Sequence, residues 1–376
     1  MHYRVRPMPT KLVGTKHHQV AQLLRKHIAQ LPPGGKVPTF AELTRRFGAS
    51  RTTIETALQR LRKDGLIYRP AGKQRLVVAE LHDKAAGSIA LLRPDYPSQD
   101  YDAICCAVVE AGKKRGWVFD LLSYGDLRAL DLERAWGNND AALLLPNCQE
   151  FPPHLVRVLS NPRKPIVLLQ EHWVGRGVCN VCVDDRMVGR MAVEHLISLG
   201  HRRILMLLEQ PHVSSVMERY EGWREAMIGI GETDLESLLV DCQVENGQHP
   251  LTVAYAGMSR WMETNRTKFT AIFSTTEYGA IAAIRTLDEH GLKVPDDVSV
   301  ISFAGKSNLC AFIRPPLTAV EIDMESYGRA TADALSELLS QSSASAGEIK
   351  IKPALWMRRT TGRAPDQTSR SRSDNE

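Results

Sequence analysis

The sequence contains 376 residues, of which 43% are hydrophobic, so it is long enough for two or three packed units and too long for one small domain. Its apolar stretches are only a handful of residues long, well short of the roughly 20 that a membrane-spanning helix requires. The basic N-terminus lacks the apolar core of a secretion signal. We therefore expect a multidomain cytoplasmic protein without a membrane span.

The net charge of +5 conceals an uneven division of charge along the chain. Residues 1–80 hold 16 Lys and Arg against 4 Asp and Glu, a net +12, whereas the remainder holds 32 against 39, a net −7. A basic segment joined to an acidic remainder is typical of a protein that meets a polyanion at one end. A basic face that is merely exposed to solvent is the alternative interpretation. The local sequence pattern of this segment must distinguish the two.

Three helices are predicted in this basic segment. Residues 16–30 carry apolar side chains at helical spacing and predict an amphipathic helix. Thr39 stands three residues before Glu42, a capping box that predicts a second helix over residues 40–47. A glycine then permits a sharp turn, and a third helix is predicted over residues 51–64. The pattern is that of a helix-turn-helix.

Residues 66–69 and 75–78 predict two short strands joined by residues 70–74, which would form a wing. In such domains the start of the second turn helix enters the major groove, while the wing and the first helix end hold phosphates. Arg51 would bind a guanine edge with its two-donor fork, and Arg45, Arg46 and Lys73 are better placed for phosphate. The predicted DNA contacts are Thr39, Arg45, Arg46, Ser50, Arg51, Thr52, Thr53, Gly72 and Lys73.

Residues 37–78 resemble the winged-helix domain of the GntR family of regulators, with the sequence VPTFAELTRRFGASRTTIETALQRLRKDGLIYRPAGKQRLVV. The most specific parts are the Pro-Thr entry to the second helix, the SRTTI start of the third, and the DGLI passage into the wing. Ala41 and Glu55 stand where relatives commonly have arginines, so the resemblance implies DNA binding but leaves the operator sequence open. A few helix-turn-helix modules serve only as protein contacts, which is the alternative interpretation.

Beyond a polar connector, short apolar runs alternate with helical patterns. Strands are predicted at residues 89–92, 118–122, 141–145, 166–169, 204–208, 271–273 and 298–303, and helices near residues 101–115, 186–199, 215–228 and 278–290. This alternation predicts parallel sheets with helices on both faces. There are too many units for one small sheet, so we expect two doubly wound lobes with a ligand site at the carboxyl ends of their strands.

The cysteines indicate a reducing compartment, because seven of them occur without the spacing of a disulfide framework. Cys179 and Cys182 form a C-x-x-C motif. A four-ligand zinc site would need a second pair, and a redox motif would start a helix, whereas residues 178–183 predict a strand. We therefore expect structural cysteines, no bound metal and no cofactor.

Three passages of the remaining chain resemble the sugar-binding domain of the LacI family, which is itself similar to periplasmic binding proteins. They are VDDRMVGRMAVEHLISLGHRRILML, TAIFSTTEYGAIAAIRTLDEHGLKVPDDVSVISFAG and RPPLTAVEID. The resemblance implies that the chain passes three times between the lobes. The expected parts are an arm (1–15), an α+β winged helix (16–79), a linker (80–87), a two-lobed α/β domain (88–362) and a disordered tail (363–376). Lobe one would hold residues 88–185 and 303–323, and lobe two residues 186–302 and 324–362.

The LacI resemblance implies that Arg219 binds ligand hydroxyls with its two fixed donors. Thr276 and Glu277 stand where relatives commonly carry an Asn-Asp pair, and Ala304 and Gly305 where two aspartates are common. The loss of a carboxylate at Ala304 removes an acceptor pair for sugar hydroxyls. A different sugar, a sugar derivative and a non-sugar effector therefore all stay open.

Other side chains are candidates to complete this pocket. Gln170 and Glu171, at the end of a predicted strand, would supply replacement acceptors for ligand hydroxyls. Trp173 or Tyr96 would stack on an apolar sugar face, although aromatic packing in the core explains them equally well.

Together these features predict a GntR/LacI composite regulator, of the kind known among sugar-responsive repressors of Gram-positive bacteria. It would be a homodimer on double-stranded operator DNA, and its effector would favour one arrangement of the lobes over the other. A sugar-binding module without a regulatory role and an enzyme are the alternatives. No P-loop, G-x-S-x-G or metal-binding His/Glu spacing supports an enzyme. Repression is expected only by analogy with both families.

Overall fold

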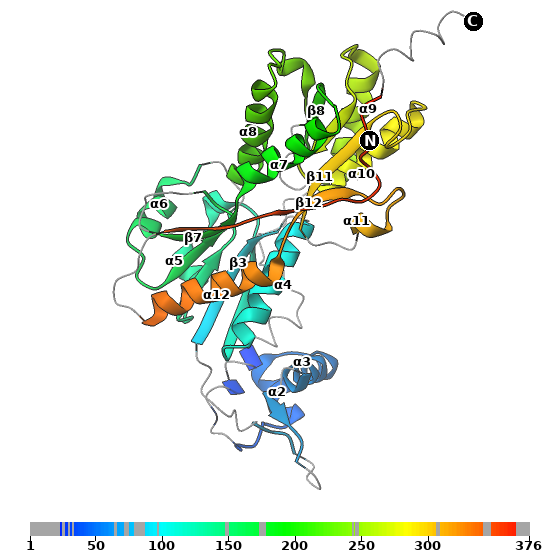
Figure 1. Ribbon diagram of the computed structural model, residues 1–376. Helices are drawn as coiled ribbons and strands as arrows, with labels where there is room; N and C mark the ends of the chain where they lie inside the picture. The colour runs from blue at the N-terminus through cyan, green and yellow to red at the C-terminus, as the bar shows by residue number, and fades with distance from the viewer. Residues whose placement is uncertain are drawn as a thin grey trace, which may run out of the picture. The chain divides into compact units, whose positions relative to one another are not determined.

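The chain divides into two units, residues 1–85 and 86–376, and each is described by itself (Figure 1). The computed structural model describes residues 23–24, 27–28, 31, 34–63, 66–70, 75–78, 87–95, 98–146, 150–172, 178–242, 244, 248–305, 309–340 and 347–365. None of the helices in these ranges is long and apolar enough to cross a membrane.

The first unit is a helix-turn-helix followed by a two-stranded wing. Its described elements are α2 (Phe40–Phe47), α3 (Arg51–Lys63), β1 (Ile67–Tyr68) and β2 (Val77–Val78). The predicted capping box is present, because the Thr39 amide donates to Glu42 Oε2 at 2.6 Å and the Glu42 amide donates to Thr39 Oγ1 at 3.4 Å. Gly48 ends α2 in the left-handed region, with φ of 58°, which favours glycine. β1 and β2 pair antiparallel.

A small apolar core holds this unit together. Leu24, Ile28, Leu43, Ile54 and Ile67 are all buried in it. The predicted first helix lies mostly outside the described residues, but the four positions described there are helical. Leu24 and Ile28, one turn apart, supply the apolar face that the sequence predicted.

The second unit contains two six-stranded sheets, which confirms the predicted pair of doubly wound lobes. We define lobe one by the sheet with strand order β13-β7-β6-β5-β3-β4 and lobe two by the sheet with order β14-β12-β11-β10-β8-β9. Lobe one holds β3 (Gly87–Pro94), β4 (Trp117–Tyr124), β5 (Ala141–Leu144), β6 (Ile166–Leu169), β7 (Cys179–Val183) and β13 (Glu348–Ile351). Lobe two holds β8 (Ile204–Leu208), β9 (Leu239–Asp241), β10 (Ala271–Ser274), β11 (Ser299–Gly305), β12 (Thr318–Ile322) and β14 (Ala354–Trp356). All neighbouring strands are parallel except β12 and β14.

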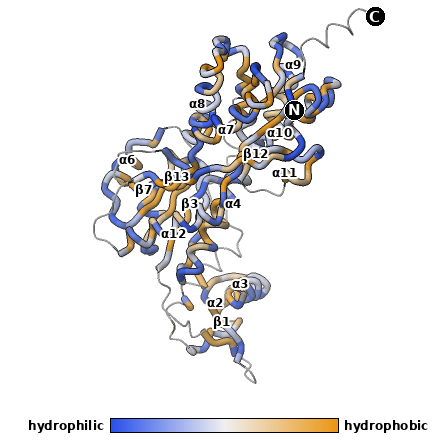
Figure 2. Tube along the Cα trace, viewed as in Figure 1, coloured by the Kyte–Doolittle hydropathy of each residue, from blue (hydrophilic) through white to orange (hydrophobic). Residues whose placement is uncertain are grey.

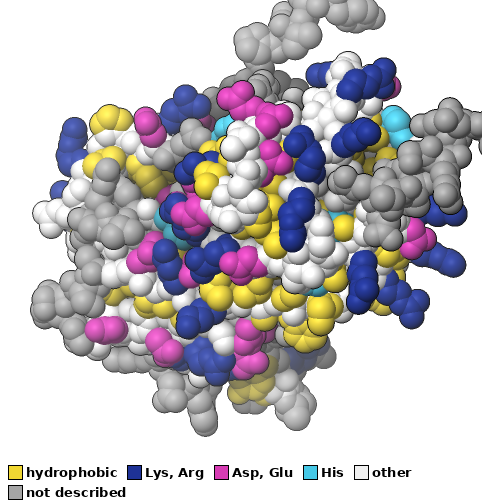
Figure 3. Space-filling model, turned by 45° about the horizontal axis from the view of Figure 1, so that its top comes forward, with side chains coloured by type: hydrophobic (Ala, Val, Ile, Leu, Met, Phe, Trp, Pro, Cys, Tyr) yellow, Lys and Arg dark blue, Asp and Glu magenta, His cyan; other side chains and the backbone are white. Residues whose placement is uncertain are grey.

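Helices cover the two sheets. Lobe one carries α4 (Gln99–Lys113), α5 (Leu132–Trp136), α6 (Pro153–Ser160) and α12 (Met324–Ser340). Lobe two carries α7 (Asp185–Ser198), α8 (Ser214–Gly229), α9 (Pro250–Thr264), α10 (Glu277–Glu289) and the short α11 (Leu309–Phe312). In Figure 2 helices such as α8 and α12 alternate hydrophobic and hydrophilic residues, as expected of helices that cover a sheet. On the face drawn in Figure 3, basic and acidic side chains are interspersed, as is typical of a solvated surface.

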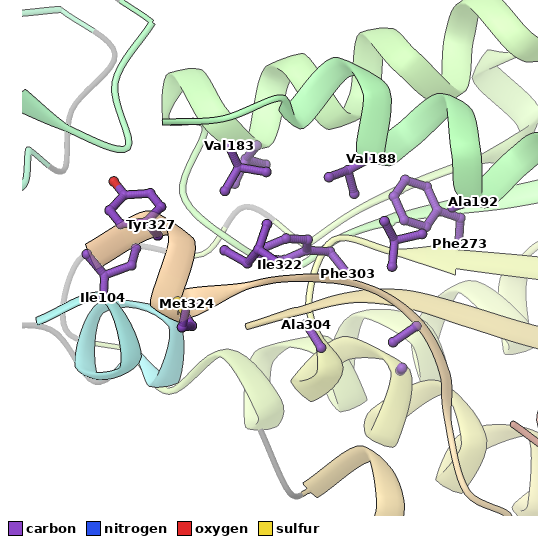
Figure 4. Packing of buried hydrophobic residues seen from close by; sticks show 14 of the residues in the cluster. Ile104, Val183, Val188, Ala192, Phe273, Phe303, Ala304, Ile322, Met324 and Tyr327 are labelled. Carbon is purple, nitrogen blue, oxygen red and sulfur yellow. The ribbon is translucent and has the colours of Figure 1, made fainter. Parts of the chain in front are cut away.

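One continuous cluster of buried hydrophobic residues extends from lobe one into lobe two. Figure 4 shows part of it, in which Val183, Val188, Phe303 and Ile322 come from β7, α7, β11 and β12. The lobes of this unit are therefore joined by packed side chains as well as by the connecting chain.

The structure corrects the predicted membership of the lobes. Residues 303–323 were assigned to lobe one, yet β12 pairs parallel with β11 in the sheet of lobe two. Residues 324–362 were assigned to lobe two, yet α12 packs beside α4 and β13 pairs with β7 in lobe one, and only β14 returns to lobe two (Figure 1). Tyr327 on α12 is fully buried and donates to the Val181 carbonyl of β7 at 2.6 Å. The prediction was wrong because the sequence of a strand does not reveal which of the two sheets the strand will join. That choice depends on which sheet edge offers unpaired backbone groups.

The ends of the predicted domain also differ in detail. Gly87, expected at the end of the linker, is the first residue of β3. Most of the predicted disordered tail lies outside the described residues, as does the predicted N-terminal arm. Residues 363–365 are described, and the Ala364 amide donates to the Leu199 carbonyl at 2.9 Å, so order extends beyond residue 362.

Candidate functional site

The start of α3 presents two exposed side chains, Arg51 and Thr52. Ser50 caps the helix, because its hydroxyl accepts a hydrogen bond from the Thr53 amide at 3.2 Å and lies 2.8 Å from the Thr53 hydroxyl. Thr53, one of the predicted DNA contacts, is buried and has its hydroxyl turned to Ser50 instead of to the surface. The helix start therefore offers Arg51 and Thr52 outward and uses Thr53 inward.

Basic side chains flank this helix start. Arg45 and Arg46 are exposed in the last turn of α2, where the negative end of the helix dipole favours cations. The Arg51 guanidinium lies 5.8 Å from the centroid of the Phe40 ring. Gly72 and Lys73, the predicted wing contacts, lie outside the described residues. The first unit thus exposes arginines from two consecutive helices.

Arg219, in the second turn of α8, is the centre of a buried polar group in the second unit. Only 3% of the residue is exposed. Its Nε donates to Asp185 Oδ1 at 2.7 Å, and one terminal nitrogen donates to the Thr275 carbonyl at 2.8 Å. The guanidinium carbon lies 3.6 Å from the centroid of the Phe303 ring, a cation–π contact. Its direction is therefore fixed by an ion pair, a carbonyl and an aromatic face.

Two glycines allow α7 and α8 to approach closely enough for the contact between Arg219 and Asp185. A Cβ at Gly189 of α7 would lie 2.0 Å from the Arg219 carbonyl oxygen. A Cβ at Gly222 of α8 would lie 2.2 Å from the Arg186 carbonyl oxygen. Any side chain at either position would push the helices apart.

A carboxylate from lobe one lies beside Gly305 at the end of β11. The Gly305 amide donates to Asp100 Oδ1 at 3.0 Å, and a Cβ at Gly305 would lie 2.6 Å from that oxygen. Burial raises the pKa of Asp100, and the charge of Arg219 partly offsets this rise. A carboxylate on α4 of lobe one thus lies against the end of β11 in lobe two.

Thr276 and Glu277 begin α10, directly after β10. The Thr276 amide and hydroxyl donate to Glu209 Oε1 at 2.6 and 2.8 Å, so the hydroxyl is already engaged. Glu209 follows β8 and is fully buried, and burial raises its pKa to about 7. Glu277 is 1% exposed. Lobe two therefore places two buried carboxyl groups at the carboxyl ends of its strands.

Gln170 and Glu171 follow β6 and are both buried. Gln170 has φ of 56°, and its Oε1 accepts from the Val183 amide at 3.0 Å, so the predicted replacement acceptor serves the internal structure of lobe one. Glu171 Oε1 accepts from the His172 amide at 2.9 Å, and burial raises the pKa of Glu171. Tyr96 and Trp173 lie outside the described residues.

Both units match known protein families. Residues 16–77 match the gntR family of bacterial regulatory proteins, and residues 193–361 match a periplasmic binding protein-like domain. The chain joins a gntR-type domain to a periplasmic binding protein-like domain. The two resemblances seen in the sequence are therefore confirmed.

Relatives of this composite chain are transcriptional regulators. The HTH-type transcriptional regulator MalR of Streptomyces coelicolor is 33% identical over 50% of this chain and 53% of its own length, so the match spans about half of that relative. The arabinose metabolism transcriptional repressor of Geobacillus stearothermophilus is 26% identical over 88% of this chain and 93% of its own length. The crystal structure of a LacI family transcriptional regulator from Enterococcus faecium with bound ribose is 20% identical, with a TM-score of 0.62 over 73% of this chain and 98% of that one. The chain is thus similar to proteins that are named as transcriptional regulators.

Several residues of the binding-protein-like domain were missed by sequence reasoning. Three of them, Asp185, Asp100 and Glu209, lie directly after a strand or in the first turn of a helix, and Phe303 lies in the second half of β11. That position was the available signal, because ligand sites of open α/β sheets lie at the carboxyl ends of the strands. Arg219 was identified, and the structure brings Asp185, Asp100 and Phe303 around it.

Proposed function

We propose that this protein is a transcriptional repressor whose affinity for operator DNA is controlled by a sugar bound beside Arg219. The observation that carries the proposal is the fixed guanidinium of Arg219, held by Asp185, the Thr275 carbonyl and the Phe303 ring. A preorganised fork of donors beside buried carboxyl groups suits a ligand with several neighbouring hydroxyls.

Sugar recognition draws on the acceptors around Arg219. Asp100, Glu171 and Glu277 supply carboxyl oxygens for ligand hydroxyls, and Thr276 lies beside them. Gln170 orients the β6 end, and Tyr96 and Trp173 remain proposed stacking partners for an apolar sugar face. The similar arabinose metabolism repressor and the similar regulator with bound ribose support a sugar over a non-sugar effector.

DNA recognition rests on the first unit. Arg51 and Thr52 contact base edges, Arg45 and Arg46 contact phosphates, and Gly72 and Lys73 belong to the wing that lies along the backbone. Thr39 and Ser50 act through the helix starts that they cap, and Thr53 acts through its hydrogen bonds with Ser50. The protein acts as a cytoplasmic homodimer on a two-fold operator and has no catalytic activity. Light scattering of the purified chain tests the dimer, and a turnover assay with sugars and nucleotides tests the absence of catalysis.

A salt-titrated DNA-binding assay on the region upstream of the gene tests the DNA half of the proposal. Arg51→Ala should weaken specific binding by about 1–3 kcal/mol, roughly 5- to 150-fold, because a base contact is lost. Arg128→Ala removes the same charge from an exposed position in lobe one and should leave binding unchanged. Equal, weak and steeply salt-dependent binding by all three proteins would contradict specific recognition.

Calorimetric titration with arabinose, ribose and other mono- and disaccharides tests the sensing half. Arg219→Lys keeps the charge but loses the fork, so the affinity for the effector sugar should fall at least about tenfold. Arg190→Lys, at an exposed position of α7, is the matched control. A sugar that binds but does not change DNA affinity would contradict the coupling, and sugar binding that Arg219→Lys leaves intact would contradict the assigned site.

A further inference from the structure

Three side chains with metal-binding atoms converge in lobe one. His172 follows β6, Cys182 lies in β7, and Glu348 is the first residue of β13. His172 Nδ1 lies 3.1 Å from Glu348 Oε1 and 3.6 Å from Cys182 Sγ, and Cys182 Sγ lies 3.7 Å from Glu348 Oε1. The group is enclosed, because Cys182 is fully buried and the side chains of His172 and Glu348 are 10% and 15% exposed.

The pairing of β7 with β13 creates this cluster. Glu348 pairs with Asn180 and Lys350 with Cys182, so these four residues share one face of the sheet. Cys179 and Val181 face the other side, in the apolar cluster. The two thiols of the C-x-x-C motif therefore point to opposite faces of the strand, and Cys182 meets His172 and Glu348 instead of Cys179.

The distances are those of a tetrahedral metal site. Zinc binds thiolate sulfur at about 2.3 Å and imidazole nitrogen or carboxylate oxygen at about 2.0–2.2 Å, which places pairs of ligand atoms about 3.3–3.6 Å apart. The three observed separations are within a few tenths of an ångström of these values. One ion would thus contact all three atoms with little movement of the side chains.

Neighbouring groups hold the ligands in place. His172 Nε2 lies 3.2 Å from Asp185 Oδ2, so an imidazole that binds metal through Nδ1 donates its other N–H to a carboxylate, as metal-binding histidines commonly do. Lys350 Nζ lies 3.2 Å from Glu348 Oε2, the oxygen turned away from the cluster. The other oxygen of Asp185 accepts from Arg219, which connects this cluster to the proposed sugar site.

We propose that lobe one binds one divalent zinc-type ion through His172 Nδ1, Cys182 Sγ and Glu348 Oε1. A thiolate and an imidazole favour zinc over magnesium or calcium, which prefer oxygen ligands. Three protein ligands leave the fourth tetrahedral position for water or a ligand atom. The ion ties β13 and the end of β6 to β7. This proposal does not depend on the proposed regulatory function.

Cobalt(II) is the probe that tests the site, because thiolate-bound cobalt gives a charge-transfer absorption band. The full chain, stripped of metal and kept reduced, should bind one cobalt ion per chain with this band, and zinc should displace the cobalt. Cys182→Ser should abolish the band and weaken zinc binding at least about 100-fold. Cys179→Ser changes the other cysteine of the same motif and should bind like the unchanged protein.

Glu348→Gln provides a second variant, since it preserves the shape of a partly exposed side chain and should also weaken metal binding. Zinc should raise the thermal midpoint of the unchanged protein and of Cys179→Ser, but not that of Cys182→Ser. A folded protein that binds no stoichiometric cobalt or zinc would overturn the proposal and leave a hydrogen-bonded imidazole cluster. Equal loss of binding in both cysteine variants, or metal retained by Cys182→Ser and Glu348→Gln, would also overturn it.

Discussion

In the first unit the described candidate DNA contacts lie between residues 39 and 53 on two consecutive helices, whereas the second unit assembles its site from residues as far apart as Asp100 and Gly305. The first site is a local surface, because capping and helical spacing decide which side chains face outward. The second site consists of charged side chains that only the tertiary fold brings together. Changes at the first should therefore affect binding with little loss of stability, and changes at the second should affect both.

The largest effect is expected for Arg219→Ala. This change breaks the buried ion pair with the Asp185 carboxylate, which keeps only its contact with the His172 imidazole, and breaking a buried ion pair typically costs about 3–5 kcal/mol. Urea unfolding of the full chain, followed by tryptophan fluorescence from the second unit, measures the loss. Arg190→Ala removes an exposed arginine of α7 and should change stability by less than about 0.5 kcal/mol. Equal stability of the two variants would show that the buried pair of Arg219 and Asp185 does not stabilise the fold.

A smaller, pH-dependent effect is expected for Glu209→Gln. In the unfolded chain Glu209 has a pKa near its ordinary value of 4.5, and in the folded protein burial raises it to about 7. Well below pH 4.5 the carboxyl group is neutral in both the folded and the unfolded state, so its burial does not lower the free energy of unfolding through ionisation. As the pH rises from 4.5 to 7 the unfolded chain loses this proton first, and the unchanged protein loses stability relative to the variant, by roughly 3 kcal/mol above pH 7.

Thermal unfolding of the unchanged protein and of Glu209→Gln between pH 4.5 and 8 measures this difference. The advantage of the variant should be near zero at the acidic end and constant above pH 7. Glu194→Gln, at an exposed position of α7, should show no such trend. An advantage that does not vary with pH would contradict a buried, protonated Glu209.

The smallest effect is expected for Thr39→Ala in the first unit. The change removes the hydroxyl of the capping box and should destabilise α2 by about 1 kcal/mol. Hydrogen exchange of the α2 amides measures the loss. Thr52→Ala, an exposed position in the first turn of α3, is the matched control and should leave α2 unchanged. If Thr39→Ala unfolded the second unit as well, the two units would not be as independent as their separate cores indicate.

The predicted elements of both units were largely confirmed, and the errors share one cause. The capping box at Thr39, the alternating strands and the helix of Arg219 depend on residues within a few positions of one another. Thr53, the two lobe assignments and the role of Gln170 depend on partners elsewhere, such as the Val183 amide that occupies the Gln170 oxygen. The periodicity of a sequence predicts which face of a helix or strand is buried. It does not predict which residues of other elements that face will contact.

The sequence by itself determined the two kinds of domain and the helix that presents Arg51, because these depend on local spacing and on motifs within single elements. Its resemblance to the LacI family also singled out Arg219 as a candidate for the second site. Only the tertiary structure decided that the Asp100 carboxylate meets the Gly305 amide, and that Cys182 meets His172 and Glu348 rather than Cys179. The physical reason is tertiary packing, because the pairing of β7 with β13 places Cys182 near Glu348 and the contact of α4 with β11 places Asp100 beside Gly305. Asp100 and Gly305 are separated by 205 positions, and Cys182 and Glu348 by 166.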